Sequence, residues 1–219
     1  MQDLLTVNGM VLKAEPIGEY DRRVVLLTLE RGKISTFAKG ARKINNRFMA
    51  TTNPFCFGEF KLFEGRSAYS INEADIKNFF ESFRTDMDGS LYGMYFLEVA
   101  DYYTRENNDE REFLKLLYQS LRALENENLP NDLVRSVFEI KSVVVNGEFP
   151  GIMLDEEGNK LYTDAAVFAI NYIVESSIEK LYTFSVTEEV LKELKDFSSR
   201  LMKKFTDKPF KSLEILDYL

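Results

Sequence analysis

Histidine is absent from this sequence of 219 residues, and cysteine occurs once, as Cys56. Because imidazole is the commonest general base and a frequent zinc ligand, its absence excludes the usual hydrolase triads and most zinc sites. A single cysteine excludes an internal disulfide and fits a reducing cytoplasm. Cys56 lies between Phe55 and Phe57, so we expect a buried structural thiol rather than a reactive one.

Long apolar runs are also missing, since none approaches the ~20 residues that a membrane-spanning helix needs. The amino terminus, Met1-Gln2-Asp3, lacks the basic and then apolar pattern of an export signal. No glycine-rich nucleotide-binding pattern, of either the Gly-x-Gly-x-x-Gly or the Walker type, precedes a predicted helix. We therefore expect a cytoplasmic protein with no membrane partner and no cofactor.

Acidic residues are missing from positions 31–58, in a chain whose formal net charge is −8. A segment that excludes negative charge within an acidic chain is typical of a surface that meets a polyanion, most often nucleic acid. A solvated basic loop is the alternative from charge alone. The stretch carries six basic residues: Arg31, Lys33, Lys39, Arg42, Lys43 and Arg47.

The charge is divided unequally along the chain. Residues 1–80 carry 12 basic and 9 acidic residues, a net of +3, whereas residues 81–219 carry 16 and 27, a net of −11. Such asymmetry indicates two domains with different partners.

The first half is predicted to form five short antiparallel strands, rich in Val, Leu, Ile, Thr and Phe and bounded by turn residues. They span residues 6–13, 24–30, 34–39, 54–63 and 67–74, with a polar loop at 40–53. Five short strands favour a small closed barrel, because closure removes exposed edges. The oligonucleotide-binding (OB) barrel is the five-stranded candidate, and an SH3-like barrel is the alternative.

The second half is predicted to be helical, because its apolar residues recur at three- and four-residue intervals behind capping residues. The expected helices cover residues 90–105, 109–124, 130–147, 165–182 and 187–205. A hairpin is expected near residues 147–162. The fold class is therefore α+β, with an N-terminal five-stranded OB-fold barrel in residues 1–80 and an all-helical domain in residues 81–219.

Several motifs make the chain similar to the RecO recombination mediator family over essentially its whole length. They are Val11-Leu12-Lys13, Gly18-Glu19-Tyr20-Asp21, Gly32-Lys33-Ile34, Ala38-Lys39-Gly40-Ala41-Arg42, Phe138-Glu139-Ile140-Lys141 with Gly147, and Lys208-Pro209-Phe210-Lys211-Ser212-Leu213. One departure concerns the hairpin, where many members carry four zinc-binding cysteines. This chain has none there, so the resemblance implies no metal.

The resemblance implies a protein that binds single- and double-stranded DNA and anneals complementary strands. It also implies that the protein acts with RecR to load RecA on DNA coated with single-strand-binding protein (SSB). This is a binding role rather than an enzymatic one, and the resemblance implies a location at the nucleoid. We expect the DNA phosphates to meet Arg22, Arg23, Lys33, Lys39, Arg42, Lys43 and Arg47. Phe37, Phe48 or Tyr69 are candidates for stacking on bases. The acidic tail of SSB, which ends in Phe, is expected at Lys203, Lys204, Lys208 and Lys211, beside Phe205 and Phe210.

Two other function classes stay open from the residues alone. A protein-interaction scaffold would use the barrel to bind protein, with the basic loop incidental. A metal-dependent nuclease would use acidic clusters such as Asp86 with Asp88, or Asp155 with Glu156 and Glu157. These acids lie on predicted turns outside the basic stretch, which disfavours the nuclease.

Overall fold

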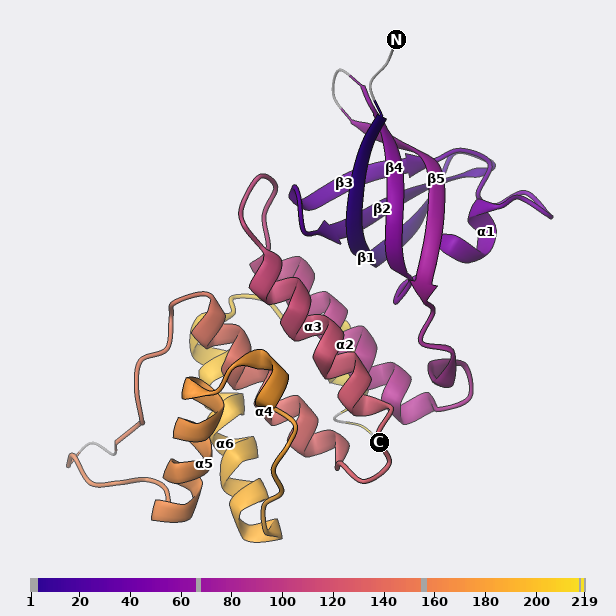
Figure 1. Ribbon diagram of the computed structural model, residues 1–219. Coiled ribbons are helices and arrows are strands. Elements are labelled where there is room, and N and C mark those ends of the chain that lie inside the picture. Colours follow the sequence, from indigo (N-terminus) through magenta and orange to yellow (C-terminus); the bar gives the residue numbers. More distant parts are fainter. Residues whose placement is uncertain (1–3, 66–67, 155–156, 217, 219) are drawn as a thin grey trace. The chain divides into compact units, whose positions relative to one another are not determined.

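The computed structural model describes residues 4–65, 68–154, 157–216 and 218. The chain divides into two compact units, Met1–Leu114 and Lys115–Leu219. A β-barrel forms most of the first unit and helices form the second (Figure 1). The predicted α+β class, with a five-stranded barrel followed by helices, is confirmed.

The five strands close into a barrel in the order β1-β2-β3-β5-β4. Their bounds are β1 Leu4–Ile17, β2 Asp21–Thr28, β3 Gly32–Ala38, β4 Phe57–Glu64 and β5 Tyr69–Asn78. Four of the junctions are antiparallel, but β3 and β5 pair in parallel. The prediction of purely antiparallel strands was wrong at this junction. Because β5 is the second strand of the β4–β5 hairpin, it runs in the same direction as β3, the strand that it pairs with. Arg66 and Ser67, assigned to a turn and a strand from the sequence, lie outside the described residues.

Buried residues alternate with half-buried ones along β3 and β4, as strands with one face in the core require. Val24, Ile34 and Phe60 are among the side chains that fill the interior. Cys56 belongs to the same core and is 2% exposed. Burial raises the pKa of its thiol to about 11, so the expectation of a buried structural thiol is confirmed.

A short helix, α1 Phe48–Thr51, interrupts the segment between β3 and β4, where the sequence predicted only a polar loop. Phe48 is the reason, because its ring is 6% exposed and packs with the barrel core. The hydroxyl of Thr52 donates to the carbonyl of Phe48 at 2.7 Å and closes the helical turn.

The turn between β2 and β3 is bound to the segment that follows α2 Met87–Tyr103. The amide of Lys33 donates to the carbonyl of Arg105 at 3.0 Å, and that of Asn107 donates to the carbonyl of Arg31 at 3.0 Å. Gly32 allows this close approach, since its φ is +62° and a Cβ there would lie 2.4 Å from the carbonyl oxygen of Arg105. These bonds attach α2 to the barrel unit, whereas the sequence placed the domain boundary at residue 80, just after the strands.

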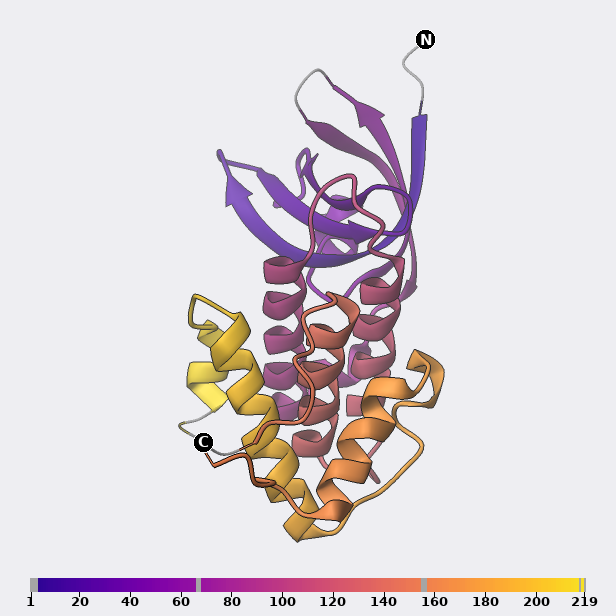
Figure 2. The same cartoon turned by 90° about the vertical axis from the view of Figure 1, so that its left-hand side faces the viewer.

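The helical unit is built around α4, which packs against α5 and α6, while α5 and α6 also contact each other (Figures 1 and 2). The bounds of these helices are α4 Asn131–Val145, α5 Asp164–Glu175, α6 Glu188–Phe205 and α7 Lys211–Leu216. Helix α3, Arg111–Leu124, begins in the first unit and continues into the second. Among the described residues, no helix combines the length and the apolar composition needed to cross a bilayer.

Helix α5 ends at Glu175 and is followed by a 3-10 turn, Ile178–Lys180, so the predicted extension to Tyr182 was wrong. Lys141 of α4, the last residue of the Phe138–Lys141 motif, lies at this helix end. Its ammonium is almost buried and donates to the carbonyls of Ile173, Val174 and Ser176 at 2.7 to 3.2 Å. The carbonyls of Ile173 and Val174 are among those that a helix end leaves without an intrahelical partner, and Ser176 directly follows the helix.

The segment between α4 and α5 keeps a hairpin contact without cysteine. Gly147, at φ +73°, ends α4, and the only ladder contact in the described part of this segment is a bridge between Leu154 and Lys160. The rings of Phe149 and Tyr162 both pack on Phe197 of α6. Asp155 and Glu156 lie outside the described residues.

Candidate nucleic-acid interface

Four of the predicted cations lie on one exposed loop between β3 and α1. We call residues 39–47 the basic loop. Its exposed cations are Lys39, Arg42, Lys43 and Arg47. In Figure 1 the chain between β3 and α1 projects away from the strands of the barrel. The structure therefore brings together four of the seven residues that the sequence assigned to DNA.

The basic loop is held against the turn between β1 and β2. The guanidinium of Arg42 donates to the carbonyls of Gly18 and Glu19 at 3.3 and 3.2 Å, and the amide of Arg42 donates to the carbonyl of Tyr20 at 2.8 Å. The ammonium of Lys43 lies 4.9 Å from the centre of the Tyr20 ring, a cation–π distance. These contacts give the loop a defined shape while its cations stay accessible.

Arg22 and Arg23 are neighbours on β2 but have different surroundings. One nitrogen of Arg22 lies 3.0 to 3.1 Å from the carbonyl of Met49, the hydroxyl of Thr52 and the side-chain oxygen of Asn53. Arg22 therefore fixes the α1 segment. Arg23 is exposed, and its Nε donates to the hydroxyl of Ser35 at 2.9 Å, so its positive charge faces solvent.

Arg23 lines a groove across β2, β3 and the start of β5, with a volume of about 500 Å³. We call it the β2–β3 groove. Phe37 and Tyr69 line it and are half-buried, so part of each ring is available for stacking. Phe48, the third aromatic candidate, is instead a core residue. The other described lining residues are Ile17, Ser35, Glu64, Gly65, Ala68 and Glu106.

The groove and the basic loop flank the same turn. Ile17, at the end of β1, lines the groove, and Tyr20, the last residue before β2, lines a cleft of about 450 Å³ with Lys39 and Lys43. A strand that crosses the turn would meet aromatic rings on one side and cations on the other. OB barrels use this region, the face of strands two and three with the loop between strands one and two, to bind oligonucleotides.

Lys33 lies apart from this surface. Its ammonium forms an ion pair with Asp101 of α2 at 2.9 Å, and the two side chains are 22% and 32% exposed. Because its charge is balanced and largely covered, we leave Lys33 out of the candidate interface.

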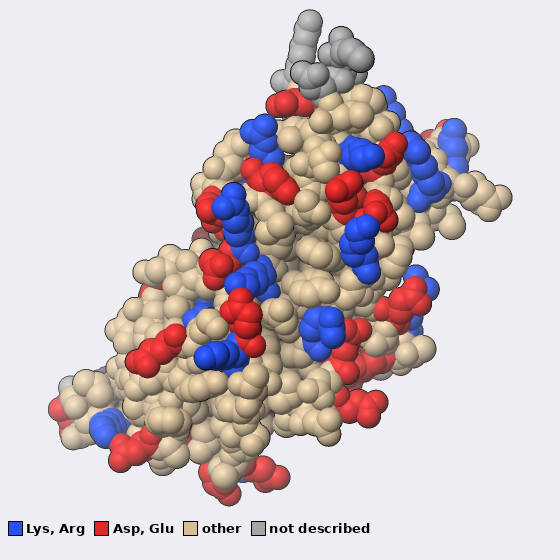
Figure 3. Space-filling view, in the orientation of Figure 1, with Lys and Arg blue, Asp and Glu red and all other residues tan. Residues whose placement is uncertain are grey.

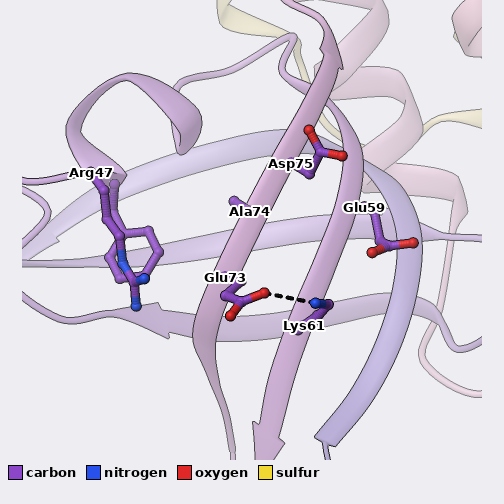
Figure 4. A pocket seen from close by; sticks show the side chains of 7 residues that line it. Arg47, Glu59, Lys61, Glu73, Ala74 and Asp75 are labelled. Carbon is purple, nitrogen blue, oxygen red and sulfur yellow. Dashed lines mark hydrogen bonds and ion pairs between the residues drawn. The ribbon is translucent and has the colours of Figure 1, made fainter.

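The outer face of β4 and β5 limits the basic surface, because carboxylates predominate there. Figure 4 shows Lys61 and Glu73 paired across the two strands, with Glu59 and Asp75 nearby and Arg47 at the edge. The ion pair is 2.8 Å long, and it lowers the pKa of Glu73 and raises the pKa of Lys61. Figure 3 shows acidic and basic side chains interspersed over the visible face of the barrel. A polyanion gains little by lying across this face.

The predicted tail-binding lysines are only partly brought together. Lys203 and Lys208 line a cleft of about 470 Å³ between α6 and α7, whereas Lys204 and Lys211 are not among its described lining residues. Sequence reasoning missed Arg135, which also lines the cleft and pairs with Glu139 at 2.8 Å. A single arginine within the mostly apolar α4 was the available signal. The apolar part of the lining is Met202, Pro209, Phe210 and Leu213, and its acids are Glu139, Asp207 and Glu214.

Of the acids considered for a nuclease, Asp86 has a structural role, and Asp155 and Glu156 lie outside the described residues. The carboxylate of Asp86 accepts the amide of Gly89 at 3.0 Å and caps α2. Within the described part of the chain, no group of three or more acidic or cysteine side chains is placed to hold a metal ion.

Comparison with known proteins agrees with this architecture. Family models described as recombination protein O N terminal and recombination protein O C terminal match residues 1–80 and 84–153. The DNA repair protein RecO of Clostridium novyi (strain NT) is 30% identical, and the alignment covers 99% of this chain and 94% of that protein. This chain belongs to the RecO family. A RecO protein of Acetivibrio thermocellus is 29% identical over 98% of this chain and 97% of its own length. The chain is thus a member of a family of DNA repair and recombination proteins.

Proposed function

We propose that this RecO-family chain binds single- and double-stranded DNA through its barrel unit and anneals complementary strands. We also propose that it acts with RecR to load RecA on SSB-coated DNA, in the cytoplasm and at the nucleoid, and that it catalyses no bond chemistry. The observation that carries the DNA-binding proposal is the placement of Lys39, Arg42 and Lys43 on one side of a turn and the half-buried rings of Phe37 and Tyr69 on the other. Arg47 lies on the same loop but points toward β5, where it donates to the carbonyl of Asn72.

The proposed contacts are of two kinds. Lys39, Arg42, Lys43 and Arg47, with Arg23 at the groove, neutralise phosphates and so give binding without sequence preference. Phe37 and Tyr69 stack on bases, at ~1–3 kcal/mol each. Modest positive charge on a small barrel suits annealing, because it screens repulsion between two strands without holding either one irreversibly.

Salt dependence tests the electrostatic part. If about four phosphates of a single strand are neutralised, the log–log slope of affinity against salt is roughly −3. Raising salt from ~50 to ~200 mM then weakens binding about fifty-fold. Fluorescence anisotropy with a labelled oligonucleotide measures the slope, and a slope near zero contradicts the proposal.

A matched pair of variants identifies the surface. Lys39→Gln with Lys43→Gln removes two charges from the basic loop and should reduce the salt slope by about 1.4. Lys61→Gln with Lys77→Gln removes two charges from the β4–β5 face of the same barrel and should leave the slope unchanged. Equal effects of the two pairs would favour general electrostatic attraction over a defined surface. Annealing of SSB-coated complementary oligonucleotides by both pairs then tests the mediator role.

We further propose that the cleft between α6 and α7 binds the acidic, Phe-ended tail of SSB. Lys203 and Lys208 offer cations for its carboxylates, beside the apolar surface of Met202, with Phe210 at the cleft wall. The charge of Arg135 in the same cleft is balanced by Glu139. Lys203→Ala with Lys208→Ala should weaken tail-peptide binding about tenfold or more, since charge-assisted hydrogen bonds are lost. Lys204→Ala with Lys211→Ala removes the same charge outside the cleft and is the control. Equal affinities for the two double variants would remove the assignment.

A further inference from the structure

The tip of the basic loop carries an isoleucine, Ile44, whose side chain is 86% exposed. Loop tips are ordinarily Gly, Asn, Asp, Ser or Pro, because these residues suit turn conformations and water. The barrel has an apolar interior available, and neighbouring Phe48 enters it, yet Ile44 does not. Its side chain therefore adds nothing to the core and is available to a ligand.

The local backbone holds Ile44 outward. The amide of Asn46 donates to the carbonyl of Lys43 at 3.2 Å, which closes a four-residue turn with Ile44 as its second residue. Asn45, the third residue, has a φ of +63°, the conformation that a type II turn requires at this position and that Asn tolerates. The tip is therefore a defined turn.

The turn is fixed on both sides. The amide of Lys43 donates to the carbonyl of Gly40 at 2.9 Å, and the side chain of Asn46 accepts the amide of Phe48 at 2.8 Å. Arg47 donates to the carbonyl of Asn72 at 2.5 Å. A β-branched side chain on such a turn has little freedom of its own, because its χ1 is restricted. Ile44 is thus a rigid apolar projection.

Three cations, Arg42, Lys43 and Arg47, lie within three residues of Ile44 in the sequence and are exposed on the same loop. Their charges bring phosphates to the loop, and bases lie next to phosphates along a strand. Proteins that distort nucleic acid insert Ile, Leu, Met, Phe or Pro between stacked bases, with basic residues on the neighbouring backbone. An exposed apolar tip on a loop that carries exposed cations has the same combination of side chains.

We propose that Ile44 is a wedge that inserts between adjacent bases of a bound DNA strand and unstacks them. The proposal rests on the proposed DNA binding and adds a base-separating element to it. Breaking the stack removes ordered single-strand structure that an incoming complementary strand would otherwise have to rearrange during annealing. The β2–β3 groove would hold bases by stacking, whereas Ile44 would interrupt their stacking with one another.

The test uses the full chain and a single-stranded oligoadenylate that contains 2-aminopurine at intervals, since this base fluoresces more strongly when it is unstacked. Saturation with the unaltered protein should raise the fluorescence about twofold or more. Ile44→Ala should lose most of this rise while its affinity by anisotropy stays within about threefold, because phosphate contacts dominate affinity. Ile44→Leu keeps an apolar wedge and should keep the rise.

A control variant and two opposing outcomes make the test decisive. Met49→Ala, which changes an apolar side chain of α1 that is 44% exposed, should behave like the unaltered protein. If Ile44→Ala retains the full fluorescence rise, the wedge is overturned while DNA binding stands. If the unaltered protein does not bind the oligonucleotide at all, the proposed function itself fails.

A basic loop with an apolar tip is also a pattern seen at membrane surfaces. Sedimentation with vesicles of phosphatidylglycerol and phosphatidylcholine separates the two. Binding of vesicles that Ile44→Ala abolishes, without a fluorescence rise on DNA, would overturn the wedge. Absence of vesicle binding together with the Ile44-dependent rise supports it.

Discussion

The ammonium of Lys33 lies 2.9 Å from the carboxylate of Asp101 and 2.5 Å from the carbonyl oxygen of the same residue. The two residues are 68 positions apart in the chain. They join β3 to α2 within the barrel unit, next to the backbone bonds between the β2–β3 turn and the segment after α2. A residue whose sequence context suggests DNA contact therefore has an architectural partner.

Replacement of Lys33 tests which role applies. Lys33→Met should lower the free energy of unfolding by ~1–2 kcal/mol, because a partly covered charged hydrogen bond is lost. DNA affinity and its salt slope should stay unchanged. Denaturant titration and anisotropy measure the two quantities on one preparation. A slope reduced by about 0.7 with unchanged stability would show that Lys33 contacts a phosphate.

Gly32 should tolerate no side chain. Gly32→Ala places a Cβ 2.4 Å from the carbonyl oxygen of Arg105 and 2.8 Å from that of Asn108, at a φ of +62°. We expect a loss of ~3 kcal/mol or more in the free energy of unfolding, from backbone strain and from displacement of the α2 segment.

Gly18 provides the control, since its φ is +56° but nothing lies within 4 Å of an added Cβ. Gly18→Ala should therefore show the backbone cost alone, ~1 kcal/mol. Equal losses for the two variants, measured by denaturant titration, would mean that the close approach at Gly32 carries no energy.

Lys141 should be among the most important lysines for stability. Lys141 is 7% exposed, and its ammonium donates to three carbonyls at the end of α5. Lys141→Met keeps the length of the chain but leaves those carbonyls without this donor, which should cost ~3 kcal/mol in the free energy of unfolding. Lys192→Met, at an exposed position of α6, should change it by less than ~0.5 kcal/mol.

Acid should weaken the helical unit through Glu179. A hydrogen bond from Lys115 holds the pKa of Glu179 at about 2, below its ordinary value of 4.5. A carboxyl whose pKa is lowered on folding adds stability above the unfolded pKa and loses it as pH falls through the folded pKa. The stability difference between the unaltered protein and Glu179→Gln should therefore be full above pH 4.5 and vanish near pH 2. Urea titrations across this range measure it, and a pH-independent difference would contradict the assignment.

The sequence predicts the parts of this fold that depend on local pattern. Residues that favour strands, bounded by turn residues, located the strands. Capping residues before apolar periodicity located α5 and α6, whose caps are Thr163 and Thr187, and Gly147 follows the end of α4 at a positive φ. The parallel junction of β3 with β5 and the early end of α5 escaped prediction, because each depends on residues distant in sequence. The bonds from Lys141 to the end of α5, for example, connect positions 32 to 35 residues apart.

The candidate site likewise contains residues that local pattern predicts and residues whose surroundings depend on distant parts of the chain. Charge pattern alone identified the basic loop, because four of its exposed cations are close in sequence. It could not distinguish Arg22, which binds the α1 segment, from Arg23 beside it, which faces solvent. Alternation along β2 gives neighbouring residues opposite faces, but what lies against each face is decided by the fold. The partner of Lys33 was likewise beyond any local pattern.

The junction of β3 with β5 has one more consequence. Among the described residues only two register pairs join these strands, Thr36 with Tyr69 and Phe37 with Ser70, and Phe37 and Tyr69 also line the β2–β3 groove. The groove thus runs along the least-bonded seam of the barrel. Backbone amides at this seam should exchange with deuterium sooner than those of β1 and β2. A bound oligonucleotide that lies across the seam should slow their exchange.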